Sequence, residues 1–311
     1  MDKNSKIYVA GHNGLVGSAI TRALIQLGYS NLILKNRSEL DLLDPAVTAQ
    51  FFSKEKPEYV FLAAAKVGGI MANLTYPADF IYENLTVQNN VIHNAYKNSV
   101  KKLLFLGSSC IYPKNCPQPM REDYLLSSDL EPSNKPYSIS KISGIILCQS
   151  YNKQYGTNFI SVMPTNLYGP SDKYDLNNSH VIPAMIIKFH RAKKNDENEV
   201  VMWGTGSPKR EFLYSDDLAQ ACIYLMNGYD DSEIVNIGTG KDISIKELAE
   251  LIKKIVGFNG EIKWDTTKPD GVPKKLLDVT KLNNLGWNYS IELEQGLKVA
   301  YDWYVKNIAE K

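Results

Sequence analysis

Apolar and polar positions follow two different rhythms along the first half of the chain. Short continuous apolar runs, typical of parallel strands covered on both faces, predict strands. Such runs occupy residues 6–10, 31–34, 59–65, 102–106 and 158–163. Between them, apolar residues recur three and four positions apart, which predicts helices over residues 15–27, 77–96 and 137–155. The alternation predicts an α/β fold, Rossmann-like, with a doubly wound parallel sheet.

Beyond residue 170 the regular alternation weakens. Polar residues fill 171–180, and a charged bend follows at 195–199. Further helices are expected at 181–194, 216–226, 244–256 and 292–307, and short strands at 200–203, 234–237 and 261–264. We therefore expect a Rossmann domain over residues 1–170, to which some later segments return, and a smaller C-terminal α/β substrate lobe over residues 171–311.

The totals argue against some classes of partner. Among 311 residues, 35 are Lys or Arg and 34 are Asp or Glu, so the net charge is +1. This balance gives no reason to expect nucleic acid or an anionic membrane as a partner. No apolar run approaches the roughly 18 residues that a membrane span needs. No apolar signal region precedes the first expected strand.

The cysteines bear on metal binding and on the cellular compartment. Cys110, Cys116, Cys148 and Cys222 have neither the spacing of a metal site nor histidines at matching intervals. Unpaired cysteines are usual in a reducing compartment. We therefore expect a cytoplasmic protein that holds no metal.

A glycine-rich turn joins the first expected strand to the first expected helix. Three glycines, each three residues from the next, let the backbone turn tightly and approach a pyrophosphate at the helix N-terminus. A plain structural turn is the alternative, but the position between strand and helix favours a dinucleotide site. The expected contacts are Gly11, Asn13, Gly14, Leu15, Val16 and Gly17.

The end of the second expected strand bears on the choice of cofactor. A dinucleotide fold that prefers NAD carries an acidic residue there, whereas this chain carries Lys35 and Arg37. Because a cation suits the 2′-phosphate of NADP, we expect NADP(H) as the cofactor. Leu40 and Asp41 follow on the adenine side. A solvated loop residue is the alternative for Arg37.

Small and polar residues mark the ends of the later strands. Open α/β sheets bind ligands at the carboxyl ends of their strands, and small side chains let a cofactor come close. The further cofactor contacts expected at these ends are Ala64, Leu106, Gly107, Pro164, Thr165, Asn166 and Leu167.

A serine, a tyrosine and a lysine form the candidate catalytic set. Ser108 follows a strand end, and Tyr137 and Lys141 stand four apart on an expected helix, hence on one face. The Lys141 ammonium should lower the pKa of the Tyr137 phenol. The two hydroxyl groups can polarise a carbonyl and give it a proton. A chance helix pair is the alternative for Tyr137 and Lys141.

The glycine turn with Ser108, Tyr137 and Lys141 resembles the extended short-chain dehydrogenase/reductases that modify nucleotide sugars. Within them, the resemblance is to the GDP-L-fucose synthase group and spans essentially the whole chain. The blocks that carry it are residues 64–70, 107–113, 163–170, 178–183 and 268–271. One departure is Asn13, where that group commonly has an arginine; this predicts weaker discrimination against NAD.

The resemblance implies NADPH-dependent 3,5-epimerisation and 4-keto reduction of GDP-4-keto-6-deoxy-D-mannose to GDP-L-fucose. It implies that Cys110 removes protons beside the ketone and that His180 returns them from the other face. It also places Lys141 and His180 beside the cofactor. For the GDP moiety it implies Lys188, Trp203, Arg210 and Asp270, and for the assembly a homodimer through residues 77–96 and 137–155.

Two other readings stay open. A related GDP-4-keto sugar, such as a heptose or another deoxy-sugar, could be reduced at C4 with epimerisation partial or absent. A non-catalytic NADP-binding sensor or scaffold belongs to a different class of protein. An intact serine, tyrosine and lysine set with Cys110 and His180 argues against that class, because a scaffold does not need five reactive groups.

Overall fold

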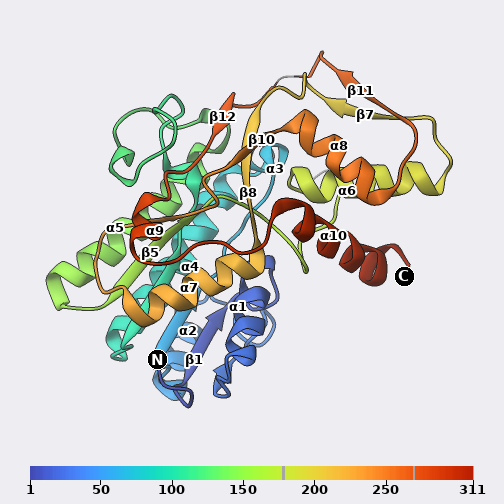
Figure 1. Cartoon of the computed structure of the whole chain (residues 1–311). Coiled ribbons are helices and arrows are strands. Elements are labelled where there is room, and N and C mark those ends of the chain that lie inside the picture. The colour runs from blue at the N-terminus through green and yellow to red at the C-terminus, as the bar shows by residue number, and fades with distance from the viewer. Residues whose placement is uncertain (177–178, 269, 311) are drawn as a thin grey trace.

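The computed structural model describes residues 1–176, 179–268 and 270–310. A six-stranded parallel sheet, in the order β2-β1-β3-β4-β5-β9, forms the centre of the first lobe (Figure 1). Its strands are β1 Ile7–Ala10, β2 Leu32–Ile33, β3 Tyr59–Leu62, β4 Lys102–Leu106, β5 Phe159–Pro164 and β9 Val235–Ile237. The predicted doubly wound Rossmann-like sheet is confirmed.

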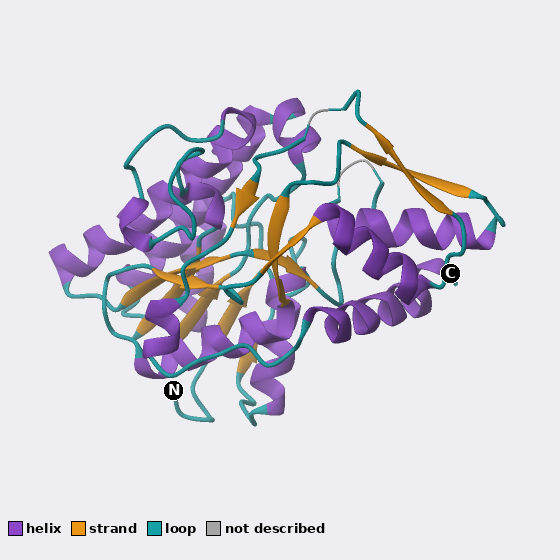
Figure 2. Ribbon diagram, turned by 45° about the horizontal axis from the view of Figure 1, so that its top comes forward, coloured by secondary structure: helices purple, strands orange, loops and turns teal. Residues whose placement is uncertain are grey.

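Helices cover both faces of this sheet, which explains why its strands are continuously apolar (Figure 2). The helices that pack on one face share a core containing Phe52, Val91 and Ile145, and those on the other share a core containing Ile20 and Leu218. On the first face lie α2 Pro45–Glu55, α4 Pro77–Lys97 and α5 Lys135–Tyr155; on the second lie α1 Leu15–Gln26 and α7 Ser215–Gly228.

The second lobe is a smaller α/β unit built around β8, Lys209–Tyr214. β8 pairs antiparallel with β10 and parallel with β12 and β6. Most of the other strands and helices of this lobe, though not β12, contribute to a third apolar core. Their bounds are β6 Asn166–Tyr168, α6 Val181–Lys194, β7 Glu199–Trp203, β10 Asp242–Ser244, α8 Ile245–Val256, β11 Glu261–Asp265, β12 Lys274–Lys275 and α10 Leu293–Tyr304.

The chain crosses between the lobes more than once. Strand β6, before residue 170, already pairs with β8 of the second lobe. Helix α7 then packs on α1, and β9 pairs with β5, so both belong to the first lobe. These crossings bring Thr165, just after β5, to Glu211 of β8, and Cys110, in the turn after β4, to Lys275 of β12.

Three of the described α-helices were not predicted from the sequence. Helix α2 begins at Pro45 and is capped by Asp44, whose carboxylate accepts from the backbone N–H groups of Ala46 and Val47. Helix α3, Ile70–Thr75, lies between the expected strand 59–65 and the expected helix 77–96, where the sequence analysis predicts no element. The remaining short elements are η1 Ser109–Ile111, η2 Glu122–Tyr124, η3 Pro132–Asn134, α9 Thr280–Asn284 and η4 Val305–Ala309.

Membrane and metal features can be checked over the described ranges. None of the helices in those ranges combines the length and the apolar character needed to cross a bilayer. The same ranges contain no group of three or more His, Cys, Asp or Glu residues arranged to hold a metal ion. All four cysteines are unpaired.

Candidate active site

The turn after β4 brings Ser108 and Cys110 together. Ser108 has an extended backbone and precedes η1, and its hydroxyl accepts from the backbone N–H of Cys110 at 3.3 Å. The Ser108 hydroxyl also lies close enough to the Tyr137 phenol to favour its anion. The Ser138 hydroxyl ties the start of α5 to this turn by donating to the Cys110 carbonyl at 2.8 Å. The turn and the helix therefore hold three candidate catalytic groups in one place.

Lys141 shares a helical face with Tyr137, as predicted. Its Nζ lies 5.9 Å from the centre of the Tyr137 ring and donates to the Leu106 carbonyl at 2.7 Å. Lys141 is buried, and this burial lowers the pKa of its ammonium to about 8. Lys141 is thus fixed to the end of β4 and carries a charge that can be lost at mildly alkaline pH.

The predicted direction of the Tyr137 pKa is wrong. Burial raises the pKa of the Tyr137 phenol, and the nearby Cys110 adds to the rise, while Ser108 opposes it. Residue spacing reveals the charge of Lys141 but not the loss of solvent around the phenol. Tyr137 therefore keeps its proton at neutral pH, which suits a proton donor.

His180 precedes α6 as its N-cap residue, and its side chain makes no capping hydrogen bond to any described residue. His180 is exposed at the surface, but neighbouring atoms exclude part of the water around its imidazole. This partial desolvation lowers the pKa of the imidazole. His180 is then neutral at pH 7. Among the described residues, neither Cys110 nor Tyr137 contributes to this shift, so the pairing of His180 with them stays a prediction. Asn178 of the block that suggested this role lies outside the described residues.

Lys275 is a residue of this site that the sequence analysis missed. It lies on β12, opposite Arg210 of β8, and its Nζ is 4.0 Å from the Cys110 sulfur. A two-residue strand in a polar stretch has no periodic pattern that would reveal it. The only available signal was its position four residues after the block 268–271.

Arg210 and Asp270 come together in the second lobe. Asp270 accepts from the backbone N–H of Thr205 at 2.9 Å and from its hydroxyl at 2.6 Å, and these bonds and Arg210 lower the pKa of its carboxyl. Burial lowers the pKa of Arg210, while Asp270 and Cys110 oppose that shift. Arg210 is therefore within electrostatic reach of both lobes. Pro269, in the same block, lies outside the described residues.

Lys188 and Trp203 are both found at β7. Lys188 donates from Nζ to the Val201 carbonyl at 2.9 Å, and burial lowers the pKa of its ammonium. Trp203 is exposed at the end of the same strand, with the Lys268 ammonium 5.8 Å from the centre of its ring. An exposed aromatic face beside cations fits a purine and a diphosphate better than an apolar ligand.

The glycine turn has the geometry of a pyrophosphate cradle. Gly11 has φ +83°, and a Cβ there would lie 2.8 Å from the Ala64 Cα, so only glycine fits. A side chain at Gly17 would collide with the Gly11 carbonyl. Gly14 is the N-cap of α1, and no side chain of the described residues caps this helix end. The first backbone N–H groups of the helix, at Leu15 and Val16, are therefore available to an anion. The exposed Asn13 lies in the same turn.

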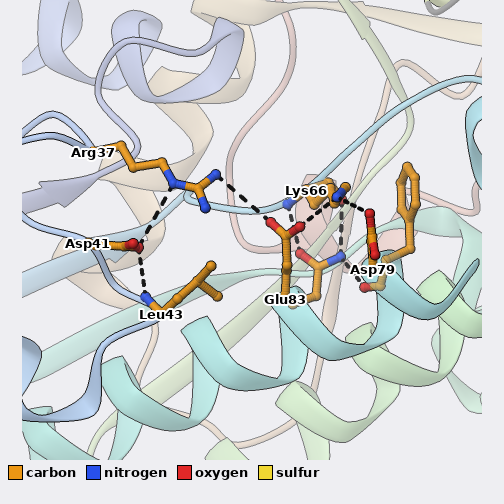
Figure 3. Close-up of polar contacts among 8 residues, drawn as sticks. Arg37, Asp41, Leu43, Lys66, Asp79 and Glu83 are labelled. Atoms are coloured by element: carbon orange, nitrogen blue, oxygen red, sulfur yellow. Dashed lines mark hydrogen bonds and ion pairs between the residues drawn. The ribbon is translucent and has the colours of Figure 1, made fainter. Parts of the chain in front are cut away.

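Arg37 is held loosely in a network of charges (Figure 3). Its side chain is 71% exposed and lies 3.9 Å from both Asp41 and Glu83. Lys66 binds Glu83 at 2.5 Å and Asp79 at 2.9 Å, and so neutralises much of the acidic charge beside Arg37. An exposed guanidinium with such long ion pairs can turn toward a phosphate at little cost.

The other expected cofactor contacts hold the strand ends together. Leu40 is buried in the core. The Thr165 hydroxyl and the Asn166 amide both donate to the Glu211 carbonyl of β8, at 3.2 and 2.9 Å. Leu106, Gly107 and Pro164 are buried and Leu167 is half-buried. Roles in cofactor binding stay predictions for these residues.

Comparison with known proteins decides the family. A model of the NAD dependent epimerase/dehydratase family matches residues 7–238. The chain belongs to this family. It is 59% identical to GDP-L-fucose synthase 1 of Arabidopsis thaliana over 100% of this chain and 96% of that one. It is 53% identical to the GDP-L-fucose synthase of Escherichia coli (strain K12), over 97% of each.

A solved structure agrees with this epimerase/dehydratase assignment. MlghC, a GDP-mannoheptose C4 reductase from Campylobacter jejuni with NADP bound, is 46% identical, with a TM-score of 0.92. The similarity covers 98% of this chain and 99% of that one. The resemblance seen in the sequence is thereby confirmed.

For a member of the epimerase/dehydratase family, the arrangement supports chemistry at a carbonyl. Ser108 and Tyr137 offer two hydroxyl groups to one oxygen, and Cys110 lies in the same turn as Ser108. Lys275 and Arg210 place positive charge on the side of the second lobe. The site can hold an anionic substrate, polarise its ketone and move protons beside that ketone.

Proposed function

We propose that the protein converts GDP-4-keto-6-deoxy-D-mannose into GDP-L-fucose, epimerising C3 and C5 and reducing C4 with NADPH. The observation that carries the proposal is the meeting of Ser108, Cys110 and Tyr137 at the end of β4. The similarity to named GDP-L-fucose synthases over the whole chain supports the choice of substrate.

Epimerisation uses the acidity that the C4 ketone gives to the C–H bonds at C3 and C5. Cys110 removes a proton from one face of the carbon, and His180, after taking a proton from solvent, gives that proton to the opposite face. Ser108 and Tyr137 donate to the ketone oxygen, which becomes an enolate oxygen during each exchange. Because one carbonyl activates both carbons, one site suffices for both exchanges.

Reduction takes place at the same carbonyl. NADPH supplies a hydride to C4 when bound. Tyr137 gives its proton to the oxygen, which agrees with a phenol whose pKa burial keeps high. The turn from Gly11 to Gly17 binds the pyrophosphate, and Arg37 binds the 2′-phosphate.

The GDP moiety binds in the second lobe. Arg210 and Lys188 neutralise the diphosphate, and the exposed Trp203 offers a flat surface to the guanine. Asp270, held by Thr205, accepts from a hydroxyl or N–H group of the nucleoside. This arrangement directs the sugar toward Cys110.

A second candidate is C4 reduction of a GDP-4-keto heptose, with epimerisation partial or absent. The similarity to MlghC supports it. The proton-transfer pair Cys110 and His180 favours the first candidate, because reduction alone needs neither residue.

The test is to supply each GDP-4-keto sugar with NADPH and to identify the product by NMR. The proposal predicts GDP-L-fucose from the 6-deoxyhexose at a rate well above that for the heptose. Faster turnover of the heptose would replace it with the second candidate. Absence of NADPH oxidation with either sugar would favour a non-catalytic NADP-binding protein.

The assembly and the location belong to the same proposal. Apolar side chains such as Tyr82 of α4 and Ile146 of α5 are exposed, which supports a homodimer through these two helices. The four unpaired cysteines support a cytoplasmic location.

A further inference from the structure

One cation of the second lobe contacts a reactive side chain of the first. The Lys275 Nζ lies 4.0 Å from the Cys110 sulfur, which is the outer limit of a hydrogen bond to sulfur and close enough for electrostatic attraction. Lys275 is half-buried, and so is Cys110. The contact crosses the site where the two lobes meet.

The backbone at Lys275 and just after it is fixed from both lobes. Lys275 pairs with Arg210 in the parallel register of β12 and β8. Leu276 donates its N–H to the Gln118 side chain at 2.9 Å, and Leu277 donates its N–H to the buried Glu211 carboxylate at 2.8 Å. Lys275 is therefore placed by the fold and is not a freely moving surface lysine.

The neighbouring Lys274 provides a contrast. Successive side chains of a strand point to opposite faces, and the Lys274 Nζ pairs with Asp242 at 3.1 Å. The two lysines share a strand and a charge but differ in the group they face. This makes Lys274 a matched control for Lys275.

We propose that Lys275 is a positioning residue for Cys110, an inference that rests on the proposed function. Its ammonium holds the sulfur toward the sugar and supplies the positive charge that a thiolate base needs beside it. When Cys110 takes a proton from C3 or C5, the sulfur becomes a neutral thiol and Lys275 stays charged. Lys275 thereby serves proton exchange and leaves hydride transfer to other groups.

Arg210 does not replace Lys275 in this role. Its guanidinium interacts electrostatically with both Asp270 and Cys110, and the proposed function assigns it to the diphosphate. The ammonium of Lys275 is the group that makes a direct contact with the sulfur among the described residues. Loss of Lys275 should therefore weaken Cys110 as a base without emptying the nucleotide site.

The experiment measures how fast iodoacetamide alkylates Cys110 at neutral pH, with no sugar present. The variants are made in a Cys116→Ser background, because Cys116 also interacts electrostatically with Lys275. Cys148 and Cys222 are buried, so the remaining signal comes from Cys110. Lys275→Met should slow alkylation about tenfold, because the favourable charge beside the sulfur is lost. Lys275→Arg should keep most of the rate, and Lys274→Met should leave it unchanged.

A second measurement tests proton exchange directly. In heavy water, Lys275→Met should slow the uptake of deuterium at C3 and C5 of the sugar substrate. It should have a smaller effect on NADPH oxidation when the substrate supplied is already epimerised. An alkylation rate within twofold of the parent, or an equal loss in Lys274→Met, would overturn the proposal. Because alkylation needs no sugar, its outcome stands apart from failure of the proposed function.

Discussion

Tyr137 holds its proton because the protein shields the phenol from water, and burial raises its pKa. In the proposed mechanism, the phenol is the acid that protonates the ketone oxygen. Tyr137→Phe removes the proton that reduction needs and keeps the ring packed against Phe80 at 6.2 Å. We expect NADPH oxidation to fall by at least about a hundredfold, while slow deuterium exchange at C3 or C5 survives. Reduction at the parental rate would show that another group donates the proton.

Lys141 links activity to pH through its charge. Burial lowers the pKa of its ammonium to about 8, so the charged form prevails below that pH and is lost as pH rises through it. The rate of reduction should accordingly fall above about pH 8. Lys141→Arg keeps a charge at all accessible pH values, so its lower rate should show no such fall. If the reduction rate of the parent protein stayed constant up to pH 10, the charge of Lys141 would not be needed for catalysis.

At the scale of elements, Glu211 holds three segments of the second lobe together. Its fully buried carboxylate accepts from the backbone N–H groups of Thr239, Gly240 and Leu277, at 2.6 to 2.8 Å. Glu211→Ala leaves these three donors without that acceptor. We expect the free energy of unfolding to fall by about 3 kcal/mol, measured by urea titration.

A surface carboxylate provides the control for Glu211. Asp123 pairs with Arg121 at 2.8 Å, and both side chains are exposed. Asp123→Asn should change the free energy of unfolding by less than about 1 kcal/mol. Equal effects of the two substitutions would mean that β12 does not depend on the Glu211 carboxylate.

The sequence specifies the elements better than their contacts. Apolar runs and glycine spacing were enough for the first-lobe strands and the turn at Gly11 to Gly17. Helix α2 was missed although Asp44 and Pro45 mark its start, because its apolar stripe is weak. Lys275 and the pKa of Tyr137 depend on partners and burial contributed by distant segments, and no local pattern encodes these.

At the scale of the whole molecule, α4 and α5 each carry exposed apolar side chains. Tyr82 is 67% exposed and Ile146 is 42% exposed. A shallow hollow lined by Pro77, Ile81 and Ile139 lies at the same helices. Such faces are typical of an interface between copies of a chain.

A charge on this face should separate the copies. Ile146→Asp is expected to give a monomer by light scattering, because a carboxylate would be buried without a partner. Val299→Asp, on the exposed part of α10, adds the same charge elsewhere and should leave the mass unchanged. A parent protein that is already a monomer would contradict the proposed homodimer.

The central claim is that one carbonyl site performs both proton exchange and reduction, with Cys110 as the base. The most direct measurement converts GDP-4-keto-6-deoxy-D-mannose with unlabelled NADPH in heavy water and locates deuterium in the product by NMR and mass spectrometry. We expect deuterium at C3 and C5, ordinary hydrogen at C4, and loss of both deuterium labels in Cys110→Ser. A product reduced at C4 without deuterium at C3 and C5, or undiminished labelling in Cys110→Ser, would contradict the account.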